Sequence, residues 1–165
     1  MNQIDLASLV LRVAVGSCIF LHGANKVKSR QSITGTAGWF ASIGMKWPKP
    51  QALLAASTEI LGGLLLIVGL AVPTAAGAVA STMVVAIVVA HRSNGFFIFN
   101  EGQGWEYCAI LAAACLALGT LGGGRVSLDH ALGWEYTGNA GLLTSCVLAV
   151  LGPTMHLAIS FRPRS

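Results

Sequence analysis

The chain alternates long apolar runs with short polar connections, and this pattern predicts a bundle of membrane-spanning helices. Nearly continuous apolar runs extend over about 6–25, 51–72, 74–91 and 106–121. Each approaches the roughly 20 residues that a helix needs to cross the hydrocarbon core of a bilayer. We therefore expect an all-α membrane protein with a core of four spanning helices.

A fifth apolar run, at about 140–161, contains Pro153. Without crossing Pro153 the run has only about 12 residues, whereas with it the run reaches the roughly 20 residues of a spanning helix. Membrane helices tolerate a proline that frees one carbonyl, here that of Ala149. We predict a fifth spanning helix at the C-terminus, with an interfacial or re-entrant segment as the alternative.

Two shorter segments are too short to span. Residues 35–43 form an apolar stretch in the first connection and predict a short interfacial helix, with Trp39, Phe40 and Ile43 facing lipid. The aromatic stretch Phe96–Phe99 follows the third run and is expected to dip into the interface or fold back against the bundle.

Composition agrees with a membrane protein. Of the 165 residues, 55% are hydrophobic and 10% charged, against about 25% charged in typical soluble domains. The net charge of +4 does not indicate nucleic-acid binding, because the cations cluster in connections, as the positive-inside rule describes. The N-terminal run lacks a basic leader and a cleavage site, so we expect it to remain as the first span.

The positions of lysine and arginine predict the orientation. With five spans, one arginine, Arg125, falls on the side of the N-terminus. The other side would be the cytoplasmic one, with the N-terminus outside and the C-terminus inside. It would hold Lys26, Lys28, Arg30, Lys46, Lys49, Arg92, Arg162 and Arg164.

Neither cysteine nor histidine spacing indicates a redox centre or a metal site. The four cysteines lie in apolar runs without a C-x-x-C pair, and we interpret them as small apolar residues. The histidines form no H-x-x-x-H or H-E-x-x-H motif. Haem or metal held by a histidine pair from two helices is a less favoured alternative. The four cysteines are Cys18, Cys108, Cys115 and Cys146.

Polar residues at membrane depth are the first candidates for function, because hydrocarbon disfavours them strongly. At about 100° per residue, Arg12, His22 and Lys26 share one face of the first helix. Glu59, on the second helix, is the expected counter-charge of Arg12. With His91 and Glu106 from the third and fourth helices, these residues predict a polar pocket that opens toward the cytoplasmic side. The alternative is structural: one ion pair, with histidines at interfacial helix ends.

Several motifs, in order, resemble the DoxX family of small membrane proteins. They are Leu11-Arg12, Phe20–Lys26, Gly35–Gly44, Glu59–Leu66, Asn94–Phe97, Gly104–Tyr107 and Ser127–Asp129. The resemblance implies a four-helix core in a bacterial or archaeal cytoplasmic membrane, here residues 1–129. Residues 130–165 are then an extension whose helix could dock another membrane subunit. Some DoxX-type proteins are subunits of thiosulfate:quinone oxidoreductase, and others are linked to oxidative-stress complexes.

The resemblance and the polar residues together give three functional hypotheses. The first is a subunit of a redox complex that binds a quinone or another small lipophilic molecule, with electrons supplied by a partner. The second is a non-catalytic scaffold, docked through the Ala/Gly-rich third helix or the C-terminal helix. The third is a path for protons or a small solute. The candidate ligand or proton-relay residues are Arg12, His22, Lys26, Glu59, His91, Asn94, Glu106 and Tyr107.

Overall fold

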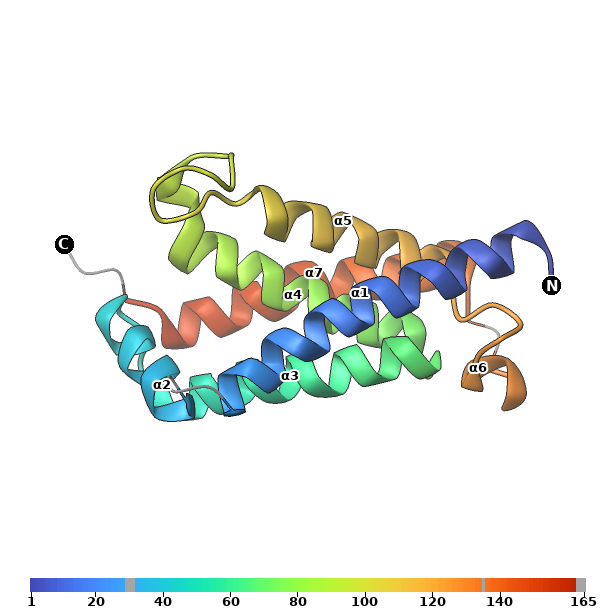
Figure 1. Ribbon diagram of the computed structural model, residues 1–165, viewed down its shortest axis with the longest axis horizontal. Coiled ribbons are helices and arrows are strands. Elements are labelled where there is room, and N and C mark those ends of the chain that lie inside the picture. The colour runs from blue at the N-terminus through green and yellow to red at the C-terminus, as the bar shows by residue number, and fades with distance from the viewer. Residues whose placement is uncertain (29–31, 135, 163–165) are drawn as a thin grey trace.

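The computed structural model describes residues 1–28, 32–134 and 136–162, and its helices form one elongated bundle (Figure 1). This confirms the predicted all-α class. Within those residues, extended pairing is limited to an isolated bridge between Met45 and Phe161. The helices are α1 (Gln3–Lys28), α2 (Ser32–Ser42), α3 (Pro48–Val68), α4 (Val72–Ala86), α5 (Glu106–Leu121), α6 (Leu128–Ala131) and α7 (Gly138–Ser160).

Four helical segments have the length and apolar character to cross a membrane: α1, α3, the continuous helix Val72–Asn94 and α7. The third of these begins as α4 and ends in a π-helical turn, Ile87–His91, and a short 3₁₀ turn, Arg92–Asn94. Helix α7 continues through Pro153 for 23 residues, which confirms the prediction of one continuous C-terminal helix. Helix α5 has the predicted bounds, and with 16 residues it is shorter than the four segments that are long enough to span a membrane.

Helices α1 and α3 run antiparallel in close contact, because glycines meet where they cross. A Cβ placed on Gly16 would lie 2.7 Å from the carbonyl oxygen of Gly63. One placed on Gly63 would lie 2.7 Å from the backbone nitrogen of Phe20. Any larger side chain would push the helices apart, so these two glycines determine which residues of α1 and α3 lie side by side.

Helix α4 lies at the centre of the bundle and packs against α3, α5 and α7. Its small residues Ala76 and Ala80 are fully buried. A Cβ on Gly77 would lie 2.8 Å from Cβ of Leu148 in α7. The small-residue face that we expected to receive a helix therefore receives α7 of the same chain. Docking of another subunit, and the division into 1–129 and 130–165, stay predictions.

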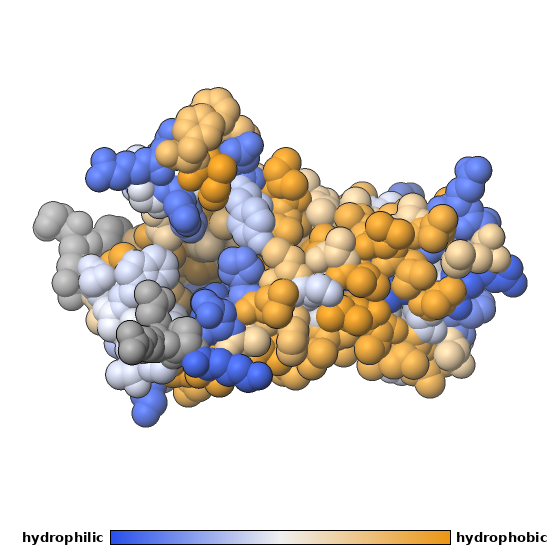
Figure 2. All heavy atoms as spheres, viewed as in Figure 1, coloured by the Kyte–Doolittle hydropathy of each residue, from blue (hydrophilic) through white to orange (hydrophobic). Residues whose placement is uncertain are grey.

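The start of α1 and the end of α7 lie at opposite ends of the bundle (Figure 1). On the face shown in Figure 2, apolar side chains form a broad band between two more hydrophilic ends. We call one end of the bundle the Lys-rich end. It contains the end of α1, helix α2, the start of α3 and the end of α7. Its described cations are Lys26, Lys28, Lys46, Lys49, Arg92 and Arg162. Arg30 and Arg164, also counted for the orientation, lie outside the described residues.

Candidate functional site

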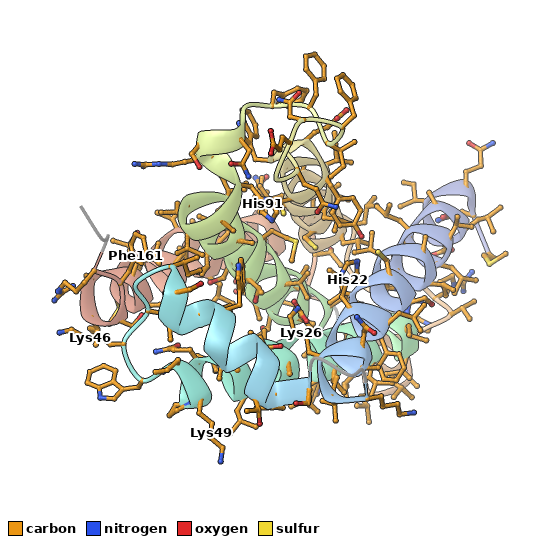
Figure 3. All side chains as sticks on the ribbon, turned by 60° about the vertical axis from the view of Figure 1, so that its left-hand side comes forward. His22, Lys26, Lys46, Lys49, His91 and Phe161 are labelled. Atoms are coloured by element: carbon orange, nitrogen blue, oxygen red, sulfur yellow. The ribbon has the colours of Figure 1, made fainter. Side chains whose placement is uncertain are left out.

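A cavity of about 280 Å³ lies near the Lys-rich end, where α1, α2, α3, the α4 helix and α5 meet. Figure 2 shows this face hollowed between α2 and the loop that follows the α4 helix. In Figure 3, His22 and Lys26 from the last turns of α1 gather around the same opening as His91. The polar side chains lining it are His22, Lys26, Glu59, Thr82, His91, Gln103 and Tyr107.

Lys26 and Glu59 form an ion pair in the wall of this cavity. Nζ of Lys26 lies 2.6 Å from Oε1 and 2.5 Å from Oε2 of Glu59. The carboxylate side chain is only 6% exposed, and the lysine 25%. Close helix packing positions the pair, since a Cβ on Gly23 would lie 2.9 Å from Cβ of Glu59. A nearly buried ion pair contributes little net stability, so its presence in a cavity wall favours a role beyond holding two helices together.

Tyr107, in the first turn of α5, connects two polar groups of α1. Its hydroxyl lies 3.2 Å from Nε2 of His22 and 2.6 Å from Sγ of Cys18. The His22 and Tyr107 rings are tilted, with centroids 5.8 Å apart. Cys18 and His22 are four residues apart, so they share a face of α1. The hydroxyl can give or accept a proton within this group, depending on the tautomer of His22.

His91 reaches the cavity from the π-helical turn at the end of the α4 helix. Its Nδ1 lies 2.8 Å from the carbonyl oxygen of Gln103, which fixes the ring against the following loop. Because a carbonyl oxygen only accepts hydrogen bonds, this contact requires Nδ1 to carry the proton and donate, which leaves Nε2 as the acceptor nitrogen in the neutral ring. Such π-helical turns often occur at functional sites.

Two predicted site residues, Asn94 and Glu106, support the loop instead of lining the cavity. The amide of Asn94 donates to the carbonyl of Gly102 at 2.8 Å, and Oε2 of Glu106 accepts from the backbone nitrogen of Ile98 at 3.1 Å. The loop holds Phe97 and Phe99 stacked at 5.1 Å and largely exposed at the bundle surface. The expectation that this aromatic stretch lies at an interface therefore stays open.

The predicted ion pair between Arg12 and Glu59 is wrong. Fully buried Arg12 instead donates through Nη1 to the carbonyls of Leu66 and Ile67, each at 3.0 Å. Its Nη2 donates to the carbonyl of Val126 at 2.6 Å. These contacts lie at the opposite end of the bundle from the cavity, and Arg12 is not among the described residues that line it.

The physical reason is the register of α1 against α3. The crossing at Gly16 and Gly63 places Arg12 beside the C-terminal end of α3, whose last carbonyls have no partner within the helix. A cation there is also favoured by the helix dipole. Gly69, which ends α3 with φ 70°, leaves the room that the guanidinium needs.

Asp129 lies at the same end of the bundle. Its carboxylate accepts hydrogen bonds from the backbone nitrogens of Ala71 and Val72, at 2.6 and 3.0 Å. These bonds cap the start of α4, where a carboxylate is favoured by the exposed N–H groups. Asp5 acts similarly on the loop after α5, accepting from the backbone nitrogen of Arg125 at 3.0 Å. Arg12, Asp129 and Asp5 thus join the helix ends and loops at this end of the bundle.

Sequence reasoning missed some of the cavity wall. Trp39 and Phe40 were expected to face lipid, yet both line the cavity, although Trp39 remains 47% exposed. Cys18 was interpreted only as a small apolar residue, although its position four residues before His22 was the available signal for its contact with Tyr107. Among the residues that the structure describes, no group of three or more His, Cys, Asp or Glu is arranged to hold a metal ion.

Comparison with known proteins supports the family resemblance that the sequence motifs indicated. The profile of the DoxX family matches residues 7–92. A curated protein of Bacillus subtilis (strain 168), named "Putative oxidoreductase CatD", is 32% identical over 117 residues, covering 71% of this chain and 81% of that protein. No solved structure matches significantly.

Proposed function

The chain belongs to the DoxX family of multi-pass membrane proteins, and from this premise we propose that it is the membrane subunit of a quinone-linked redox complex, with the ring of the quinone bound in the cavity at the Lys-rich end. The observation that carries the proposal is the convergence of an ion pair, a tyrosine hydroxyl and two histidines on one largely apolar cavity. The oxidoreductase name of the Bacillus relative points in the same direction.

The size and lining of the cavity fit a substituted quinone ring. Its volume of about 280 Å³ is near the lower limit of ligand pockets, which occupy roughly 300–1,000 Å³. It suits a ring, with the isoprenoid tail left in the bilayer. Phe40, Met83 and Leu111 supply apolar walls, while the ammonium of Lys26 and the hydroxyl of Tyr107 are hydrogen-bond donors for quinone carbonyls.

Reduction of a quinone to a quinol takes up two electrons and two protons. In this proposal the electrons come from a partner subunit. The protons enter from the Lys-rich end through side chains of the cavity wall. His22 and Tyr107 form one hydrogen-bonded route, and Lys26 and Glu59 form another.

The proposal includes an orientation and a compartment. The protein lies in a bacterial cytoplasmic membrane with its N-terminus outside, so that the Lys-rich end faces the cytoplasm and its cations follow the positive-inside rule. The cavity then opens toward the cytoplasmic leaflet.

The test is photolabelling with an azido-quinone in the native complex, together with the quinone-reduction rate. We expect labelled peptides from α1, α3 and the start of α5, and a loss of both labelling and rate in Lys26→Met and Tyr107→Phe. If both variants assemble normally and keep the wild-type rate and labelling, the quinone site is refuted. If the complex instead dissociates in Tyr107→Phe, which is expected to keep its fold, the scaffold hypothesis gains support.

A further inference from the structure

A second cavity, of about 290 Å³, lies on the other side of Phe40 and is not used by the proposed quinone site. It is lined by residues of α2, α3, the α4 helix and α7, and it shares Phe40, Ala55, Thr82, Val85 and Val89 with the first cavity. Helix α7, which supplies Leu148, Gly152 and His156, lies outside the matched family region at 7–92. The second cavity is therefore completed by the C-terminal part of the chain.

Two buried polar atoms in its wall have no hydrogen-bond partner among the described residues: Oε1 of Gln51 and Nε2 of His156. A buried polar atom without a partner costs about 1–3 kcal/mol, so both favour a ligand that satisfies them. None of the described residues lining this cavity is Asp, Glu, Lys or Arg. The polar group of such a ligand is therefore uncharged.

The two polar atoms lie toward one end of the cavity. Gln51 is in the first turn of α3, and His156 is four residues before the end of α7, so both lie near the Lys-rich end. Along the continuous helix Val72–Asn94 the lining extends from Ala78 to Val89, a length of about 16 Å at 1.5 Å per residue. The cavity thus combines unpaired hydrogen-bonding atoms near the headgroup level with mostly apolar walls toward the bilayer centre, where its polar lining side chains are the hydroxyl residues Thr58, Ser81 and Thr82.

We propose that this cavity binds a single-chain lipid whose head is a hydroxyl group. A hydroxyl donates one hydrogen bond and accepts another, so one such group can donate to Oε1 of Gln51 and accept from His156 when Nε2 carries the proton. A ketone or ester only accepts, and a plain hydrocarbon does neither. The hydrocarbon chain lies between α4 and α7 along Ala78 and Leu148.

The experiment uses the full chain in phosphatidylethanolamine/phosphatidylglycerol nanodiscs and a dodecanol that carries a photoreactive diazirine along its chain. We expect labelled peptides from α3, α4 and α7 at residues lining the second cavity, with competition by dodecanol and none by dodecane. Equal competition by dodecane, or labelling spread over lipid-facing residues such as Leu143 and Val150, would overturn the proposal.

Two variants test the site from opposite directions. Gln51→Met removes the acceptor and should lower labelling about fivefold, the equivalent of one hydrogen bond, without lowering the unfolding temperature, because an apolar atom replaces an unpaired polar one. Ala78→Leu should fill the cavity and abolish labelling. The matched controls Gln3→Met and Ala14→Leu, at exposed positions of α1, should label as the wild type does.

The outcome is separable from that of the quinone proposal. Tyr107→Phe should leave dodecanol labelling unchanged, since Tyr107 lines only the first of the two cavities. If Gln51→Met folds normally and keeps full labelling, or if Tyr107→Phe loses it, the hydroxyl-lipid site is refuted, whatever the result of the quinone experiment.

Discussion

Lys26 and Glu59 come from antiparallel helices and meet with both carboxylate oxygens within 2.6 Å of the ammonium nitrogen. Removing one partner leaves the other charge unpaired in a largely buried place. We expect Lys26→Met and Glu59→Leu each to lower the free energy of unfolding by about 3–5 kcal/mol. The double variant should recover most of that loss, which thermal unfolding of all three proteins in nanodiscs would measure. Additive losses in the double variant would contradict a direct pair.

The hydroxyl of Tyr107 is expected to matter for turnover more than for stability. Tyr107→Phe keeps the ring and removes the contact with His22, so we expect quinone reduction by the complex to fall by about 100-fold, the lower limit for losing a proton-transfer group. The unfolding temperature should change little. Tyr136→Phe is the matched control, since its hydroxyl contacts Thr144 at the other end of the bundle; it should retain the wild-type rate.

Arg12 is expected to be structural. Arg12→Met removes three hydrogen bonds to carbonyls and should lower the free energy of unfolding by about 3 kcal/mol or more. Arg12→Lys should recover only part of this, because an ammonium cannot reproduce the planar fork of the guanidinium. Chemical denaturation would measure the loss, with Arg92→Lys, at an exposed position, as the control. Quinone affinity of the folded Arg12→Lys protein should equal that of the wild type; a selective loss of affinity would return Arg12 to the ligand site.

The crossing of α1 and α3 predicts a strong sensitivity to single methyl groups. Gly16→Ala and Gly63→Ala should each lower the free energy of unfolding by about 1–3 kcal/mol, because the added carbon overpacks the contact. Gly38→Ala in α2 should not, since a Cβ there meets nothing within 4 Å. Equal unfolding temperatures for all three variants would contradict the close approach.

The orientation predicts which residues an impermeant thiol reagent reaches in intact cells. In a background without the native cysteines, Arg125→Cys should react from outside. Lys49→Cys should react only after the membrane is permeabilised. The reverse pattern would invert the proposed topology.

The span boundaries could be predicted from the sequence because hydrocarbon imposes one simple rule on every helix: backbone groups pair internally and side chains are apolar. Which cation pairs with Glu59 could not be predicted in this way. The helix face shared by Arg12, His22 and Lys26 follows from a fixed angle per residue, but the choice of partner depends on how far α1 slides along α3. That choice is determined by the contact at Gly16 and Gly63, which a single sequence does not reveal.

The residues that line the two cavities could not be predicted from the sequence either. Phe40 looks like a lipid-facing residue of an interfacial helix, and only the fold places it between two cavities. The second cavity depends on α7 meeting α3 and α4, so Gln51 and His156 give no local signal of belonging together. A helix can be predicted from the pattern of one short segment, whereas a cavity depends on how segments far apart in the chain pack together.

The hydrogen bonds of Arg12 and Asp129 lie at the far end of the bundle from the proposed quinone site, which bears on the source of its protons. They join the end of α3 and the start of α4 to the segment after α5, whereas the proposed quinone cavity lies near the Lys-rich end. In the proposed orientation, protons taken up on quinone reduction would come from the cytoplasm alone. Each turnover would then take both protons of the quinol from the cytoplasm, through the cavity wall at the Lys-rich end.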